Sequence, residues 1–259
     1  MLMTTLNILD YMLPVKECGE ATNEWNLCRS DYSRLKDIIP TNFVFNISEN
    51  HLNWMRGFRE YPEFCAAVGV YNRRLVLIFY PMDSEGKRIV EKEYPYTYLT
   101  EMVSDLKLQE IQEYTIVKNT ILSKGFEKIE KDADLAFPIS NKPVLEQDKA
   151  VEAIEKWRES GMDWFYREYK ETEGIGIFRK FYVPTADLCL DQYLTGITCS
   201  FGLKYNDIYG KMLVTLIFIS FRENLQGSER SQMISNTYDW AKPCPPICRI
   251  PDVDVGNEF

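Results

Sequence analysis

Short apolar runs separated by turn residues are the feature that most constrains the fold of this chain. Residues 64–80 read FCAAVGVYNRRLVLIFY, in which the step YNRR divides two apolar stretches, and MDSEGK follows at residues 82–87. A further run, from Met212 to Ile219, reads MLVTLIFI. Turns select Asn, Asp, Ser and Gly, and apolar runs of this length between turns are typical of buried strands. The sequence therefore predicts antiparallel meanders in both halves of the chain.

Three segments have the spacing of helices instead. Between residues 24 and 39, apolar residues recur every three or four positions, which places them on one helical face, and Pro40 marks the end. Residues 98–124 follow a looser helical pattern, and residues 147–160 form a third predicted helix that stops before Gly161. Helices that accompany antiparallel β-meanders indicate an α+β fold, in which each sheet packs with helices.

The expected organisation is two similar lobes. Residues 1–132 form a helix-plus-meander lobe, residues 133–147 a proline-containing linker, and residues 148–242 a second helix-plus-meander lobe. Residues 243–259 are expected to form an extended, proline-containing tail, because proline excludes helix and favours polyproline II.

The two lobes share a local pattern. Cys65 and Tyr71 recur as Cys199 and Tyr205 at one constant offset, each pair within an apolar strand-like run. Duplication of one helix-plus-meander unit explains this match, and so does coincidence between two strands drawn from a chain rich in Tyr and Phe. Both interpretations stay open at this point.

Charge and hydropathy narrow the class of partner. The formal net charge is −9, and no dense run of Lys and Arg is present, which disfavours nucleic acid as a partner. The apolar run at 212–219 is far shorter than the roughly 20 residues that a membrane-spanning helix needs. The first residues lack the basic and small-residue features of a signal peptide. We therefore expect a soluble protein whose partners are proteins, with no membrane contact.

Seven cysteines are scattered along the chain without the regular spacing of a disulfide framework. Such a distribution is typical of reduced, partly buried thiols in a cytoplasmic protein. The segment CPPIC nevertheless raises a zinc hypothesis, in which two cysteines near each end of the chain share one ion. This hypothesis names Cys18, Cys28, Cys244 and Cys248.

The spacing within CPPIC argues against both a zinc site and a redox pair. Each of these sites usually has two residues between its cysteines, whereas here three residues intervene and two of them are prolines. The favoured interpretation is a tail whose Pro245, Pro246 and Ile247 pack against the body of the protein or against a neighbouring subunit.

Catalytic signals are weak. His51, the single histidine, lies in the predicted turn SENHLNW and is expected to be exposed or locally hydrogen-bonded. Phosphate-binding loops and the common hydrolase and metalloprotease motifs are absent from the sequence, so no cofactor is expected. No spacing singles out an acid–base pair among the carboxylates considered, which are Glu60, Glu63, Asp163, Glu168, Glu171, Glu173, Asp187 and Asp191.

Clusters of aromatic residues are the remaining feature. The segment WFYREY, at residues 164–169, is suited either to a core or to an interface, and its interface candidates are Trp164, Tyr166 and Tyr169. We expect a non-catalytic binding or assembly protein that acts through protein–protein contacts in a homo-oligomer. The alternative is a hydrolase-type enzyme with a carboxylate and tyrosine acid–base site in a cleft between the lobes.

Overall fold

The computed structural model describes residues 11–102, 115–122, 128–136, 147–186, 188, 194–222, 234–238 and 241–248. The helices in these residues are α1 (Val15–Arg29), α2 (Tyr32–Ile38), α3 (Glu49–Arg56) and α4 (Gln147–Thr172). The strands are β1 (Met12–Pro14), β2 (Phe43–Ile47), β3 (Glu63–Tyr71), β4 (Arg74–Met82), β5 (Glu93–Glu101), β6 (Thr115–Leu122), β7 (Lys128–Ala136), β8 (Lys180–Pro184), β9 (Leu194–Asn206), β10 (Lys211–Arg222), β11 (Ile234–Tyr238) and β12 (Lys242–Cys244).

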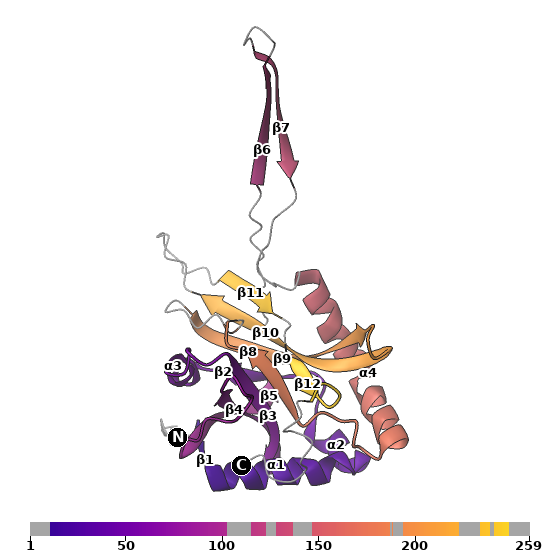
Figure 1. The fold of residues 1–259 in the computed structure, drawn as a ribbon. Helices are drawn as coiled ribbons and strands as arrows, with labels where there is room; N and C mark the ends of the chain where they lie inside the picture. The colour runs from indigo at the N-terminus through magenta and orange to yellow at the C-terminus, as the bar shows by residue number, and fades with distance from the viewer. Residues whose placement is uncertain are drawn as a thin grey trace, which may run out of the picture.

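One large antiparallel sheet forms the centre of the fold (Figure 1). Its strand order is β11-β10-β9-β2-β5-β4-β3-β8-β12, with β1 paired alongside β5. Strands β6 and β7 form a second sheet of two strands. The fold is α+β, which confirms the prediction of antiparallel meanders packed with helices.

Strands from both predicted lobes contribute to the large sheet. Strand β2 of the first half lies between β9 and β5, and β8 of the second half pairs with β3. The hairpins β3–β4 and β9–β10 are the two meanders that the apolar runs predict. The duplication and the lobe boundaries stay predictions. The predicted linker, 133–147, overlaps the end of β7 and the first residue of α4, and the residues between them lie outside the described part.

The sheet curls until its two ends approach each other. The Thr215 hydroxyl on β10 donates a hydrogen bond of 3.0 Å to the Ala241 carbonyl oxygen, just before β12. Strands β10 and β12 lie near opposite ends of the strand order, so this contact joins the two ends of a nearly closed barrel.

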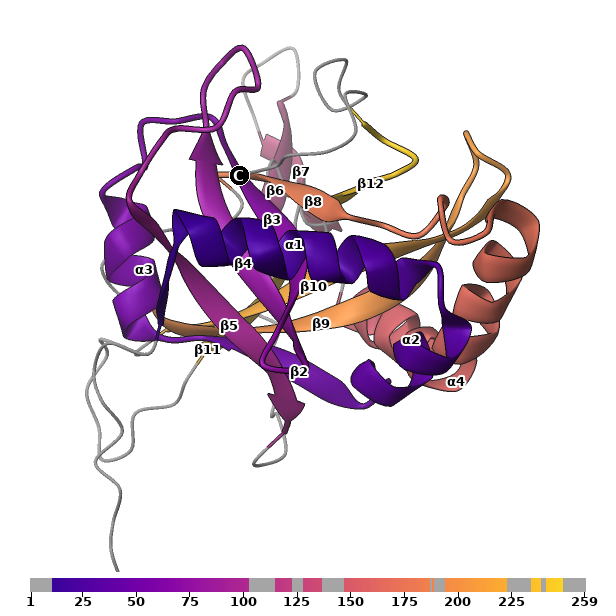
Figure 2. The same cartoon turned by 90° about the horizontal axis from the view of Figure 1, so that it is seen from below.

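Helix α1 covers the outer face of the β3–β4–β5 region, as Figure 2 shows. Cys18 and Ala21 of α1 pack there against Cys65, Ala67 and other residues at alternate positions of the strands. The intervening residues of β3, such as Phe64 and Ala66, are buried in the main core on the other face. Because both faces of β3 are covered, its sequence is a continuous apolar run rather than an alternation.

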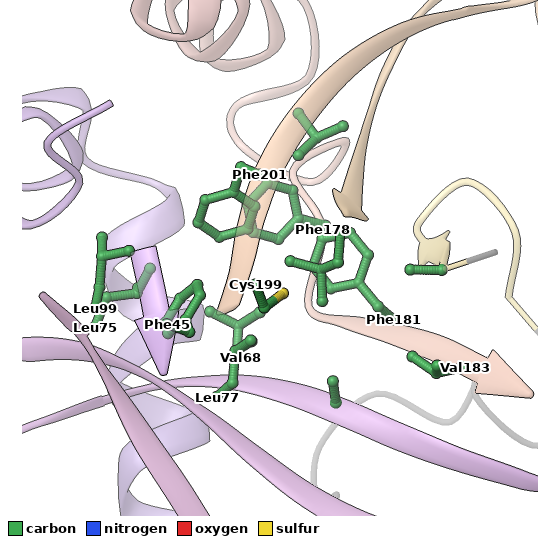
Figure 3. Packing of buried hydrophobic residues seen from close by; sticks show 14 of the residues in the cluster. Phe45, Val68, Leu75, Leu77, Leu99, Phe178, Phe181, Val183, Cys199 and Phe201 are labelled. Atoms are coloured by element: carbon green, nitrogen blue, oxygen red, sulfur yellow. The ribbon is translucent and has the colours of Figure 1, made fainter. Parts of the chain in front are cut away.

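The main core lies inside the curled sheet (Figure 3). Side chains from strands far apart in the sequence meet there: Phe45 of β2, Val68 of β3 and Phe201 of β9 are all buried. The Phe45 and Phe201 rings pack edge to face, with centroids 5.4 Å apart. Strands from both halves of the chain therefore share one core.

The predicted helices are present with different ends. The predicted helix 24–39 is divided into α1 and α2 by Asp31, whose carboxylate caps α2 by accepting from the Ser33 backbone N–H. The predicted buried face is correct, since Trp25 and Leu35 have no exposed surface. The third helix does not stop before Gly161. A Cβ at Gly161 would lie 3.0 Å from the ring of Trp157, one turn earlier in α4, and 3.2 Å from Thr41 Cγ2, so glycine leaves room for both side chains.

One prediction of local structure is wrong. Residues 98–124 are not helical where described, because 98–101 belong to β5 and 115–122 form β6. Strand β5 pairs with β2 and β4, and these long-range pairings override a loose helical pattern. The predicted tail, 243–259, is described only up to Cys248: Pro243 and Cys244 belong to β12, and a turn follows in which the Ile247 N–H donates to the Pro243 carbonyl oxygen at 2.9 Å. The extended tail stays a prediction.

The described helices include none with both the length and the apolar character required to cross a bilayer.

Candidate recognition surface

The β9–β10 hairpin ends in a turn that exposes apolar side chains. The Asn206 side-chain oxygen accepts hydrogen bonds from the backbone N–H groups of Ile208 and Tyr209, at 3.0 and 3.1 Å. Gly210 follows with a φ of +60°, a left-handed conformation that glycine adopts without strain. The Asn206 side chain holds the turn, and the Ile208 side chain takes no part in it: Ile208 is 89% exposed, and Tyr205 is 57% exposed beside it.

The C-terminal segment is anchored next to this hairpin by three kinds of contact. Strand β12 pairs with β8, with Cys244 opposite Lys180. The Arg179 backbone N–H donates a hydrogen bond of 2.7 Å to the Cys244 carbonyl oxygen. A disulfide joins Cys244 to Cys248 and closes the loop between them. The loop is therefore a fixed part of the surface in this structure.

A groove of about 220 Å³ lies between the hairpin and the C-terminal loop. Its apolar wall includes Leu213, Pro243 and Ile247. Lys204 and Lys242 are exposed at its rim, one on β9 and the other on β12. The remaining lining residues are Tyr205, Asn206, Val214, Thr215 and Ala241.

The groove differs in charge from the whole chain. The chain carries a formal net charge of −9, whereas both charged side chains that line the groove are lysines. An apolar surface with two cations at its rim is complementary to a segment that combines apolar and acidic residues. The volume lies below the roughly 300–1,000 Å³ of typical small-molecule sites, which favours one or two side chains of a protein segment.

A second hollow, of about 380 Å³, lies at the end of α3 and β8. It is lined by Arg59, Glu60, Tyr61, Pro62, Thr185 and Ala186. The Thr185 hydroxyl is buried there without a hydrogen-bond partner among the described residues. The lining contains both a positive and a negative side chain, Arg59 and Glu60, and does not favour a particular class of ligand.

The predicted interface residues divide into two groups. Trp164 is buried, and its indole N–H donates to the Met212 carbonyl oxygen at 2.9 Å, so it belongs to the core. Tyr166 and Tyr169 lie on the outer side of α4, where both rings pack against Tyr32. The second group consists of Pro245, Pro246 and Ile247, all partly exposed, and it includes a residue of the groove.

The four cysteines of the zinc hypothesis do not share one site. Cys244 and Cys248 are bonded to each other, contrary to the expectation from their spacing. Burial raises the pKa of the Cys18 thiol to about 12, and burial also raises the pKa of Cys28. Among the residues that the structure describes, no group of three or more potential metal ligands is present.

His51 has a structural role at the start of α3. It is buried, and residues 49–56 form a helix instead of the predicted turn. Its Nδ1 lies 2.7 Å from the Ser48 hydroxyl and its Nε2 lies 2.9 Å from the Tyr96 carbonyl oxygen. The neutral ring with hydrogen on Nε2 satisfies both contacts, and burial lowers the pKa of His51. Both nitrogens are therefore occupied within the fold.

The carboxylates considered from the sequence do not converge. Glu63 on β3 and Glu168 on α4 are buried, and Glu168 forms an ion pair of 2.8 Å with Lys211. Neither residue lines the two hollows described above. Glu60 lines the second hollow, and Asp163, Glu171 and Glu173 are exposed. Asp187 and Asp191 lie outside the described residues.

Sequence reasoning missed Lys204, Lys242 and Leu213 as members of one site. In the sequence, Lys204 and Lys242 are only lysines near the ends of two strands, and such lysines are common on protein surfaces. No protein-family model, curated protein or solved structure matches this chain. The candidate site therefore depends on the geometry of the groove itself.

Proposed function

We propose that this chain is a non-catalytic binding and assembly protein, and that the groove between β9–β10 and the C-terminal loop receives a segment of a second copy. The observation that carries the proposal is a groove with one apolar wall and with Lys204 and Lys242 at its rim, on an otherwise acidic chain. Like charges would repel two copies elsewhere on their surfaces, so the basic rim offers a favourable place for contact.

The segment that follows Cys248 is the occupant that fits. Residues 250–255 read IPDVDV, in which aspartate and valine alternate. In an extended segment, alternate residues fall on opposite sides, so one side presents valines and the other aspartates. Valines complement the apolar wall of the groove, and aspartates complement its two lysines. Exchange of such a terminal segment between copies is a common route to closed dimers.

The expected electrostatic contribution is modest. Exposed ion pairs are each worth about 0.2–1 kcal/mol, so two rim lysines supply roughly 0.4–2 kcal/mol of the association free energy. This contribution weakens as salt is added. Apolar contacts with the groove wall must supply the remainder, and association is therefore expected to be reversible and concentration-dependent.

Native mass tests the proposal. Size-exclusion chromatography with light scattering is run on the full chain, on a chain ending at Cys248, and on the double variant Lys204→Glu, Lys242→Glu. We expect the full chain to form dimers or larger species, and both altered chains to be monomeric at the same concentration. The matched control is Lys16→Glu, Lys36→Glu, which makes the same charge change at exposed positions of α1 and α2.

A labelled peptide of residues 249–259 separates the remaining outcomes. Binding of this peptide to the chain ending at Cys248, measured by fluorescence anisotropy and abolished by the two glutamates, supports the groove as its site. A full chain that is monomeric at all concentrations contradicts exchange between copies, even if the peptide binds. Unchanged mass in both altered chains also rejects the proposal.

A further inference from the structure

The Cys244–Cys248 disulfide joins two sulfurs in unequal environments. Cys244 has no exposed surface, whereas Cys248 is partly exposed at the end of the loop. Which sulfur an incoming thiolate attacks depends on access. An incoming thiolate can reach the bond only through Cys248, which makes Cys244 the leaving sulfur.

A cation lies beside the buried sulfur. The Arg179 guanidinium Nη2 is 3.8 Å from Cys244 Sγ, and the Arg179 backbone N–H holds the Cys244 carbonyl oxygen. A disulfide sulfur is a weak hydrogen-bond acceptor, but a thiolate at the same place would carry a full negative charge next to this guanidinium. The leaving sulfur is thus the one with a charge partner already in position.

We propose that this disulfide is a thiol–disulfide exchange site for small thiols of the glutathione class. The thiolate of the small thiol attacks Cys248 Sγ and forms a mixed disulfide, while the Sγ–Sγ bond breaks and its electron pair leaves on Cys244 Sγ. The Cys244 thiolate is stabilised by Arg179. A second small thiolate then attacks the outer sulfur of the mixed disulfide, which releases Cys248 as a thiolate and the small thiol as its own disulfide. The protein is reduced by two electrons, and two equivalents of small thiol are oxidised.

The other cysteines of the neighbourhood do not compete for this role. Cys18 and Cys65 belong to the same buried cluster as Cys244. The Cys18 thiol donates to the Leu13 carbonyl oxygen at 3.3 Å, and its burial raises its pKa to about 12, so it remains a thiol rather than an attacking thiolate.

Exchange would also alter the groove, which is the one part of this inference that rests on the proposed function. Pro243 and Ile247 both line the groove, and the disulfide spans the loop between them. Opening the bond leaves the Ile247 N–H contact with the Pro243 carbonyl oxygen, which alone is too weak to fix the shape of the loop. A site of this kind is suited to a compartment where thiol status changes, since small thiols would control the shape of the docking surface.

Site-specific mapping of bound glutathione tests the inference. The full chain is first oxidised with excess oxidised glutathione and then exposed to increasing concentrations of reduced glutathione. The reaction is quenched with an alkylating reagent, and the modified cysteines are identified by peptide mass spectrometry. We expect the mixed disulfide on Cys248 and none on Cys244. The single variant Cys244→Ser should accept glutathione at Cys248, and Cys248→Ser should leave Cys244 unmodified in the folded chain.

Replacing Arg179 tests the leaving-group role. Arg179→Gln is expected to slow reduction roughly tenfold, which corresponds to about 1.4 kcal/mol in the barrier, and Arg179→Lys should recover part of the rate because it keeps the charge. Arg158→Gln, an exposed arginine on α4, is the control and should leave the rate unchanged. Circular dichroism melts confirm that each variant is folded.

Three results would overturn the inference: glutathione on Cys244 rather than Cys248, an unchanged rate in Arg179→Gln, or a cysteine pair that does not form or open in the folded chain. None of these results depends on the oligomeric state, so failure here is distinguishable from failure of the assembly proposal.

Discussion

Two buried tryptophans offer a direct test of this packing, because one has a hydrogen-bond partner and the other has none among the residues that the structure describes. Trp25 and Trp157 both have no exposed surface. The Trp25 indole N–H donates to the Phe178 carbonyl oxygen at 2.9 Å, a contact between residues 153 positions apart. Among the described residues, the Trp157 indole nitrogen has no partner. Replacement of each by phenylalanine therefore removes similar bulk but different polar contacts.

The magnitudes follow from these contacts. Replacement of the indole by the smaller phenyl ring costs about 1–2 kcal/mol at either site through lost burial and packing. At Trp25 the change also leaves the Phe178 carbonyl oxygen without the indole N–H donor, which adds about 1–3 kcal/mol to the destabilisation. At Trp157 the change removes a buried, unsatisfied N–H and recovers a similar amount. We expect Trp25→Phe to be less stable than Trp157→Phe by at least about 2 kcal/mol, or roughly 4–8 °C in Tm for a chain of this size.

Urea denaturation followed by far-ultraviolet circular dichroism measures the difference. The slope of the unfolding free energy against urea must agree between the two variants for the comparison to hold. Equal destabilisation, or greater destabilisation in Trp157→Phe, would refute the assignment of a structural hydrogen bond to Trp25 and an unsatisfied donor to Trp157.

Two further predictions concern pH and backbone geometry. Burial lowers the pKa of His51 below its ordinary value of 6.5, so the unfolded state takes up a proton first as the pH falls. The free energy of unfolding should therefore decrease as the pH drops below about 6.5 towards the folded pKa, and His51→Gln should flatten this part of the profile measured by urea denaturation. Gly174 and Gly210 both have positive φ, but a Cβ at Gly174 would lie 2.1 Å from a backbone oxygen, whereas at Gly210 no described atom lies within 4 Å. Gly210→Ala should cost about 1 kcal/mol and Gly174→Ala at least about 3 kcal/mol, and equal melting temperatures of the two variants would contradict the close contact.

Local patterns predicted the elements whose partners are near in sequence. The hairpins β3–β4 and β9–β10 follow from apolar runs joined by turn residues, and Trp25 and Leu35 lie on the predicted helical face. His51 shows the limit of this reasoning. The segment SENH predicts a turn, yet Ser48 and His51 cap a helix, a pattern in which histidine takes the place of the usual glutamate.

The sequence by itself determined the strand-forming runs, the hairpin turns and the α+β class, because turn chemistry and hydrophobic period act within a few residues. Only the tertiary structure decided that β2 lies between β9 and β5, that Cys244 bonds to Cys248, and that Lys204 and Lys242 face one groove. Strand order across a curled sheet is selected by the burial of the whole core, to which every strand contributes. No short stretch of sequence specifies this strand order. The geometry of the candidate site depends on the strand order, so it could not be predicted either.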